Sequence, residues 1–186
     1  MSGPNPTLLD LLLELEVLDR LPRSGYILRG VAEAESVAEH TFHLAMMVWL
    51  LAGREPGLDR RRAVELALLH DLAELRIGDL PRTSSAYLAR ETKHAAERAA
   101  FADIFSPAGP EPEAIYAEYE AGASSEARFV RACDKLQLMV KVTVYQGWGA
   151  GGLAEFWRNP ANFPADEFAS IREVFAALRA RAGQAS

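Results

Sequence analysis

Apolar residues recur at helical spacing along most of the chain, and no stretch alternates between apolar and polar positions as a half-buried strand does. The N-terminal segment illustrates the pattern, because Thr7 is placed to cap a helix predicted over about residues 7–21. The apolar face of that helix consists of Leu8, Leu11, Leu12, Leu15 and Leu18. The spacing therefore predicts an all-α fold.

The remaining helices are predicted from the same spacing together with their caps and breaks. They cover about residues 37–52, 60–77, 85–105, 113–121, 125–146 and 164–182. Ser36 followed by Glu39 has the form of a capping box for the first of these helices. Ser124 or Ser125 caps the helix that starts near residue 125, and Pro81 blocks continuation of the helix over 60–77. No internal linker is predicted, so residues 1–186 form one domain.

Length and composition agree with a single globular domain. The 186 residues suffice for a core, and 49% hydrophobic with 25% charged residues is typical of a soluble protein. The N-terminal apolar run lacks a basic flank and contains three acidic residues, which excludes a signal peptide or a membrane span there. Cys133 is the single cysteine, so no internal disulfide forms and a cytoplasmic location is expected.

The charge balance restricts the class of ligand. A formal net charge of −6 argues against a nucleic-acid polymer as the main partner, because such proteins need a basic surface. It leaves room for a small phosphorylated substrate, since a metal ion and a few local arginines suffice to hold one.

The candidate chemistry lies in His70 and Asp71, with Glu74 one turn further along the predicted helix. His40 and Asp134 lie on other predicted helices, and helical bundles build metal sites from facing helices in this way. Imidazole nitrogen and carboxylate oxygen are suitable ligands for a divalent catalytic metal. Asp134 lies in an apolar stretch, where a carboxylate needs a cation or hydrogen bonds. Four such ligands leave coordination positions for water and a phosphate oxygen.

Each residue also has a purely structural interpretation. The His70–Asp71 pair alone is compatible with a surface pair, and His40 with a core histidine. Glu74 lies near the predicted C-terminus of its helix, where the macrodipole disfavours an acid, so a functional reason is expected. His43 is interpreted as a packing or outer-shell residue and His94 as solvated, which predicts a single metal ion.

The order His40, His70-Asp71, Asp134 is the signature of the HD-domain metal phosphohydrolases. That order alone marks only the superfamily. Two longer motifs, Glu35-Ser-Val-Ala-Glu-His40 and Gly78-Asp-Leu-Pro81, indicate a particular group within it. Over about residues 18–144 the chain resembles the YfbR-like 5′-deoxynucleotidases and the similar HD-domain-containing protein 2 group. The other matching segments are Arg29-Gly-Val, His70-Asp-Leu-Ala-Glu74 and Asp134-Lys-Leu.

The resemblance implies a single-domain HD helical bundle that hydrolyses deoxyribonucleoside 5′-monophosphates to deoxynucleoside and phosphate. It implies one divalent metal ion, with cobalt or manganese favoured, magnesium, iron, nickel or zinc compatible, and no organic cofactor. It also implies a homodimer, which no heptad or apolar stripe in the sequence proves. The implied metal ligands are His40, His70, Asp71 and Asp134.

The same resemblance implies catalytic and substrate-binding residues. Glu74 would assist the attacking water or the leaving 5′-oxygen, with Asp79 beside it. In the loop before residue 36 the family often carries a tryptophan, and here Tyr26 is the expected aromatic residue. Because tyrosine brings a hydroxyl where the indole would lie, the discrimination between deoxyribose and ribose is left open. We also expect Arg76 or Arg82 to add phosphate affinity. The full set of expected substrate contacts is Arg23, Tyr26, Asp79, Leu80, Pro81 and Arg82.

Two other functions are compatible with these residues. One is an HD phosphohydrolase of another specificity, for a cyclic nucleotide, a nucleoside triphosphate or a modified monophosphate. Triphosphate hydrolases of this superfamily are much longer chains, which counts against that variant. The other is a regulatory HD module without turnover, but loss of Glu74 or of a ligand would be expected there and none is lost. The sequence leaves base preference and the physiological metal open.

Overall fold

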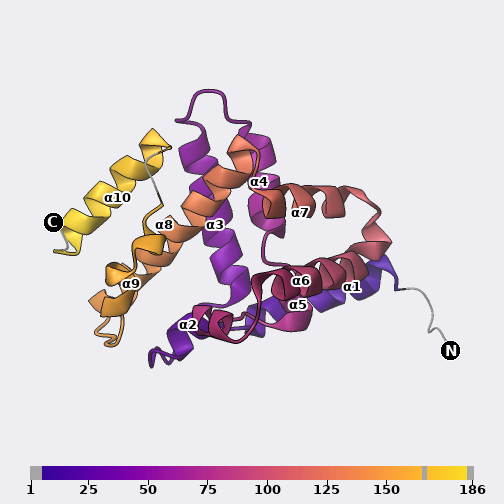
Figure 1. Cartoon of the computed structure of the whole chain (residues 1–186), viewed down its shortest axis with the longest axis horizontal. Helices are drawn as coiled ribbons and strands as arrows, with labels where there is room; N and C mark the ends of the chain where they lie inside the picture. The colour runs from indigo at the N-terminus through magenta and orange to yellow at the C-terminus, as the bar shows by residue number, and fades with distance from the viewer. Residues whose placement is uncertain (1–5, 165–166, 184–186) are drawn as a thin grey trace.

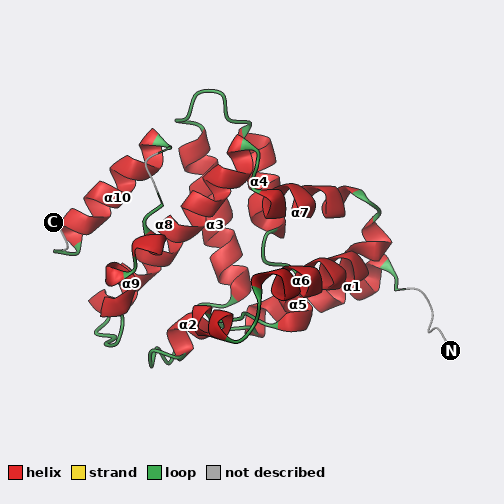
Figure 2. Ribbon diagram, viewed as in Figure 1, coloured by secondary structure: helices red, strands yellow, loops and turns green. Residues whose placement is uncertain are grey.

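The computed structural model describes residues 6–164 and 167–183, and within these ranges the chain is helical with no strand (Figure 2). Its only β-type pairing there is an isolated antiparallel bridge between Pro22 and Ser36. The predicted all-α fold is therefore confirmed. The ends of the predicted domain, residues 1–5 and 184–186, lie outside the described residues. None of the described helices is long and apolar enough to cross a bilayer.

The elements follow one another with short connections, and several one-turn helices join the longer ones (Figure 1). The α-helices are α1 Leu8–Leu15, α2 Ser24–Ile27, α3 Val37–Ala52, α4 Arg60–Leu69, α5 Glu74–Ile77, α6 Arg90–Phe105, α7 Glu111–Ala121, α8 Ser125–Gly147, α9 Ala154–Arg158 and α10 Ala169–Arg181. The 3-10 helices are η1 Glu16–Arg20, η2 Arg82–Ala86, η3 Ser106–Ala108 and η4 Pro160–Asn162.

The predicted caps are present where the sequence places them. Thr7 accepts a hydrogen bond from the backbone N–H of Asp10 and so begins α1. Ser36 and Glu39 form a reciprocal capping box at the start of α3, and Ser124 caps α8. These caps set where α3 and α8 begin, and both helices carry candidate metal ligands.

The predicted continuous helix over residues 60–77 is wrong, because α4 ends at Leu69 and α5 begins only at Glu74. Between them the backbone hydrogen bonds span three residues, as in a 3-10 turn, instead of the four of an α-helix. One example is the bond from the Leu72 N–H to the Leu69 carbonyl. The Nδ1 atom of His70 lies 2.8 Å from the carbonyl oxygen of Ala67, which an unbroken helix would use for a backbone bond. The break turns His70 and Asp71 toward α3 and α8.

Other boundaries also differ from the prediction. The predicted loop before residue 36 contains α2, and the predicted break after residue 147 is followed by α9, which the sequence pattern did not indicate. The polar helix α6 begins at Arg90, since residues 82–86 form η2 instead. The last helix begins at Ala169 rather than near residue 164, and residues 165–166 lie outside the described part.

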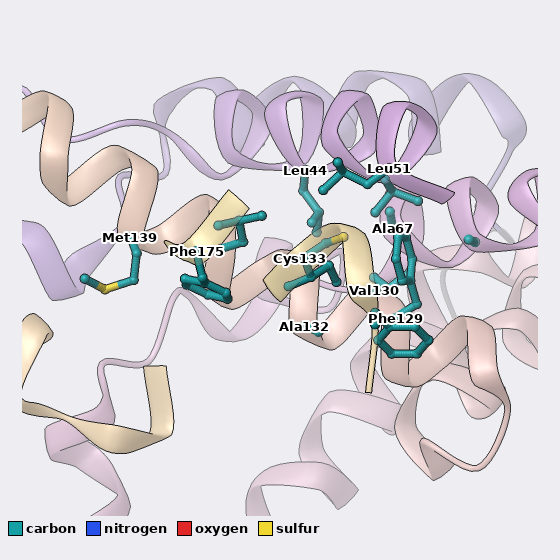
Figure 3. Packing of buried hydrophobic residues seen from close by; sticks show 14 of the residues in the cluster. Leu44, Leu51, Ala67, Phe129, Val130, Ala132, Cys133, Met139 and Phe175 are labelled. Atoms are coloured by element: carbon teal, nitrogen blue, oxygen red, sulfur yellow. The ribbon is translucent and has the colours of Figure 1, made fainter. Parts of the chain in front are cut away.

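The core lies where α3, α4 and α8 pack on one another, with α10 against α8 (Figures 1 and 3). Fully buried side chains from all three helices meet there, among them Leu44, Leu66, Phe129 and Leu136. A second cluster joins α1, α6 and α7. Leu11 of α1 belongs to it, and the rings of Phe101 and Phe105 from α6 and Tyr116 from α7 stack within it. The two clusters hold α3, α8 and the turn after α4 in fixed relation, and this positions the polar site described next.

Candidate metal centre and active-site cavity

Four predicted metal ligands come together from three parts of the chain: His40 from α3, His70 and Asp71 from the turn after α4, and Asp134 from α8. The Nε2 atom of His40 lies 3.3 Å from Nε2 of His70, 3.7 Å from Oδ2 of Asp71 and 3.5 Å from Oδ1 of Asp134. The Nε2 atom of His70 lies 3.0 Å from Oδ2 of Asp71.

This spacing suits a small divalent cation. Ligand atoms about 2.1 Å from an ion and at right angles to each other lie about 3.0 Å apart. The cluster consists of two imidazole nitrogens and two carboxylates, and both histidines are almost completely buried. Electron-rich atoms packed this closely repel one another unless a cation lies between them. The donor set therefore fits a metal of the His/carboxylate type.

Hydrogen bonds set the tautomer of both histidines so that Nε2 is free to bind metal. Nδ1 of His70 donates to the Ala67 carbonyl. Nδ1 of His40 lies 2.8 Å from Oε1 of Gln137, while the amide nitrogen of Gln137 donates to the buried carboxylate of Glu35. A carboxylate only accepts, so Gln137 must turn its oxygen to His40, and the proton of His40 is on Nδ1. Burial, assisted by Arg23, lowers the pKa of His40 to about 3, so its ring is neutral at pH 7.

We expect Gln137→Leu to weaken metal binding by roughly 10- to 100-fold, because it removes the acceptor that orients His40. The dissociation constant, measured by competition with a chelating dye, checks this. Gln146→Leu in the same helix is the matched control, since Gln146 accepts from the Trp157 indole N–H at 3.0 Å, away from the ligands. Equal metal affinity in the two variants would contradict the role of Gln137.

Arg23 lies beside the cluster and links three carboxylates. Its Nη1 atom is 2.8 Å from Oδ2 of Asp71, 3.2 Å from Oδ1 of Asp79 and 3.9 Å from Oε2 of Glu74. Burial by itself lowers the pKa of Arg23, but these carboxylates raise it overall, so the guanidinium stays charged. Asp79 in turn accepts hydrogen bonds from the backbone N–H and the hydroxyl of Ser24 at 2.6 Å each, which anchors α2 at the site.

Glu74 is the buried acid of the site. It begins α5, so the prediction that it lies at a helix C-terminus is wrong, and the dipole argument does not apply to it. Its exposed fraction is 9%, and its Oε2 atom is buried without a hydrogen-bond partner among the described residues. Burial, followed by the charge of Asp71, raises the pKa of Glu74 to about 10. At pH 7 Glu74 therefore holds a proton that it can donate.

A cavity of about 370 Å³ opens beside the cluster, within the size range of small-molecule sites. It borders Asp71, Glu74 and Asp134, and all predicted substrate residues line it. Those residues are Arg23, Tyr26, Asp79, Leu80, Pro81 and Arg82. Tyr26 is only 1% exposed, and its hydroxyl donates to the Leu138 carbonyl at 3.2 Å, so it forms the wall of the cavity.

Sequence reasoning missed the part of this cavity formed by α9 and η4. Phe156, Asn159 and Asn162 line it, and the Phe156 ring stacks on Tyr26 at 5.7 Å between centroids. The five-residue helix α9 lies between a glycine-rich stretch and Pro160, so its pattern was too short to detect. Aromatic residues after the glycines were the available signal.

Three other predictions can be compared with the structure. Arg76 does not reach the cavity, because it pairs with Glu14 and Asp103 on the outer surface. His43 is not packed in the interior, since half of its side chain is exposed, and its nearest acid is Glu35 at 3.9 Å. His94 is not simply solvated, because its Nδ1 atom lies 3.1 Å from Oε1 of Glu120.

Comparison with known proteins identifies the family of the chain. Residues 15–168, which include all four candidate ligands, match the sequence profile of the HD domain. The mouse protein named 5′-deoxynucleotidase HDDC2 is 32% identical over 149 residues, covering 78% of this chain and 73% of the mouse chain. The Xenopus laevis protein of the same name is 31% identical over 166 residues, covering 86% and 81%. A solved structure, a conserved hypothetical protein from Pyrococcus furiosus, has a TM-score of 0.81 at 32% identity and covers 92% of this chain and 99% of that chain.

Proposed function

The chain belongs to the HD domain family, and on that basis we propose that it is a metal-dependent phosphohydrolase acting on deoxyribonucleoside 5′-monophosphates. The observation that carries the proposal is the convergence of His40, His70, Asp71 and Asp134 beside a cavity of about 370 Å³. Relatives named 5′-deoxynucleotidase, similar over most of their length, support the substrate class. The products are the deoxynucleoside and inorganic phosphate.

When bound by these four ligands, a divalent cation supplies Lewis acidity to the phosphoryl group and lowers the pKa of water. Arg23, held by Asp71 and Asp79, is placed to neutralise the charge of the phosphate. Glu74 carries a proton at neutral pH and gives it to the leaving 5′-oxygen, so that the nucleoside departs as an alcohol. Asp79 keeps α2 and Arg23 in position through Ser24.

We further propose one ion at this centre, with cobalt or manganese giving the highest turnover and no organic cofactor. The ligand set accepts several first-row ions, so reloading metal-stripped protein with each ion in turn tests this point. A panel of nucleoside mono-, tri- and cyclic phosphates tests the reaction class. Release of inorganic phosphate from monophosphates supports the proposal, and turnover restricted to a triphosphate or a cyclic nucleotide replaces it.

Arg82 is the remaining arginine for which we proposed a phosphate contact. It lines the cavity, which Arg76 does not reach. We expect Arg82→Ala to raise KM for the nucleotide by about tenfold or more, because a hydrogen bond to a charged group contributes about 1.5–3 kcal/mol. Arg76→Ala is the matched control, with KM expected within about twofold of wild type. An unchanged KM in Arg82→Ala removes Arg82 from the substrate site.

We also propose a homodimer, supported by an apolar stripe on the outer face of α3. Phe42, Met46, Trp49 and Leu50 are between 43% and 61% exposed, at positions that share one side of the helix. The opposite side of α3 is buried in the core, so residues 44–52 of the helix are apolar on all sides, as expected of a helix covered on both sides. Exposed apolar area of this kind is typical of an interface between protein chains.

The stripe leads to a measurable expectation. Met46→Glu should convert the dimer to a monomer, because a charge in an apolar interface is left without a partner. Sedimentation velocity measures the change in mass. Trp148→Glu is the matched control, since Trp148 is 74% exposed at the C-terminal end of α8, outside the stripe. A wild-type protein that is already monomeric at about 10 μM overturns the dimer, since obligate dimers bind more tightly than this.

We infer a cytoplasmic location from the cysteine usage. Cys133 is free and buried in the core, so the fold needs no oxidising compartment. Fractionation of cells that make the protein tests this inference, and recovery in an oxidising compartment contradicts it.

A further inference from the structure

A second cavity, of about 280 Å³, reaches the same metal ligands from α6 and α7. The two cavities share Asp71, Lys93, Asp134 and Lys135, so they meet at the metal centre. The rest of the first cavity is formed in large part by α2, α9 and η4, whereas the second is lined by α6, α7 and α8. In Figure 1, α7 lies well away from α9 on the other side of the molecule. The metal ligands are therefore accessible by two routes.

The second cavity is rich in hydrogen-bond donors. Its cations are Arg90, Lys93, Arg131 and Lys135, and two tyrosines, Tyr116 and Tyr119, also line it. Burial raises the pKa of both tyrosines, so their hydroxyls stay protonated and able to donate. Within residues 6–164 and 167–183, neither hydroxyl makes a hydrogen bond. These groups have the chemistry that recognises an oxyanion.

Glu97 and Glu120 each pair with a basic side chain, although the Oε1 atom of Glu120 has no hydrogen-bond partner among the described residues. Glu97 pairs with Lys93, and Glu120 pairs with Arg98 at 3.1 Å and lies 3.1 Å from His94. His94, Glu97 and Glu120 are close enough to hold a cation, but each faces a basic side chain, and Arg90 lies 3.4 Å from His94. Once Asp71 and Asp134 hold a divalent ion, four cations remain against two carboxylates. The cavity therefore favours an anion over a second metal.

We propose that this second cavity binds inorganic phosphate and provides its exit route. The inference rests on the proposed function, in which water attacks phosphorus as the bond to the 5′-oxygen breaks, and the proton of Glu74 passes to that oxygen. The protons of the water stay on the phosphate that forms, and one of them then returns to the Glu74 carboxylate. Attacking and leaving oxygens lie roughly in line, so phosphate forms on the side away from the nucleoside. The nucleoside fills the first cavity, and phosphate released at the shared ligands meets Lys93, Lys135 and the donors of the second cavity.

Direct binding of inorganic phosphate to the metal-loaded protein tests this proposal without turnover. Isothermal titration at low ionic strength compares wild type with Arg90→Ala and with the isosteric Tyr116→Phe/Tyr119→Phe double variant. We expect each to raise the dissociation constant for phosphate about 10- to 30-fold, which corresponds to loss of one charge-assisted or two neutral hydrogen bonds. The inhibition constant for phosphate in the metal-loaded enzyme should rise by the same factor.

Arg76→Ala is the matched control, because Arg76 lines neither cavity, and Arg82→Ala is the comparison for the first cavity, which Arg82 alone of the two lines. Wild-type phosphate affinity in both second-cavity variants, or a larger loss in Arg82→Ala than in Arg90→Ala, overturns the proposal. If phosphate binding is lost in Arg90→Ala but no monophosphate is hydrolysed, the anion site stands, while the proposed function and the exit route both fail.

Discussion

Replacing His70 with alanine should remove the metal and lower kcat/KM for a deoxynucleoside monophosphate by about 10³-fold or more. The Nε2 atom of His70 lies 3.0 Å from Oδ2 of Asp71 and 3.3 Å from Nε2 of His40. The substitution therefore removes a metal ligand that is close to two of the others. Metal content by elemental analysis, measured beside kcat/KM, separates loss of the ion from loss of chemistry. Circular dichroism checks that the variant is folded, because His70 is buried.

His43→Ala is the control for this substitution. His43 is on the same helix as His40, but about half of its side chain is exposed, and it makes no contact with the ligands among the described residues. We expect full metal content in this variant. A His70→Ala protein that retains one equivalent of metal and wild-type turnover would contradict the assignment of His70 as a ligand.

Replacing Glu74 with glutamine should lower kcat by about 10²- to 10⁴-fold and leave metal content and KM close to wild type. Burial and Asp71 raise the pKa of Glu74 to about 10, so in the resting site the residue is neutral, like the amide that replaces it. The exchange is therefore nearly isosteric and keeps the charge balance. It removes the transferable proton, which is needed only in the transition state.

Steady-state kinetics at saturating metal measure this effect, with Glu65→Gln as the control. Glu65 pairs with Arg61 and Arg62 on the surface of α4, and its removal should change kcat by less than about twofold. A raised KM with unchanged kcat would show that Glu74 binds substrate and does not transfer a proton. Loss of metal from Glu74→Gln would instead make Glu74 a ligand.

Local chemistry made part of this structure predictable. Ser36 and Glu39 specify the start of α3 by a capping box, which places His40 in the first turn of that helix. Ser124 caps the start of α8, nine residues before Cys133. Asp134 follows Cys133 in an apolar stretch, where its carboxylate needs a polar partner. A helix cap, or a charged residue within an apolar stretch, is recognised from a few neighbouring residues, so both can be predicted from the sequence alone.

The break after α4 was not predictable in the same way. Apolar spacing continues from Leu66 through Ile77, and nothing between them is a glycine or a proline. The helix stops because His70 uses the carbonyl of Ala67 and turns toward His40, a partner 30 residues away. Tertiary contacts override local propensity here, and this is a functional position.

The orientation of His40 was missed for a related reason. Gln137 and Glu35 are ordinary polar residues in the sequence, and their relation appears only when α3 and α8 pack together. A buried glutamine one turn after Asp134 in an apolar helix was the available signal. Lys141, 3.1 Å from Glu35, completes the chain of polar contacts behind the metal ligands.

The most direct test of the central claim is phosphate release from matched deoxyribo- and ribonucleoside 5′-monophosphates by metal-stripped protein, before and after addition of cobalt or manganese. We predict no release without metal, release from the deoxy compounds with metal, and loss of that release in Glu74→Gln. Metal-loaded protein that hydrolyses no 5′-monophosphate, although it binds the ion through His40, His70, Asp71 and Asp134, would contradict the account.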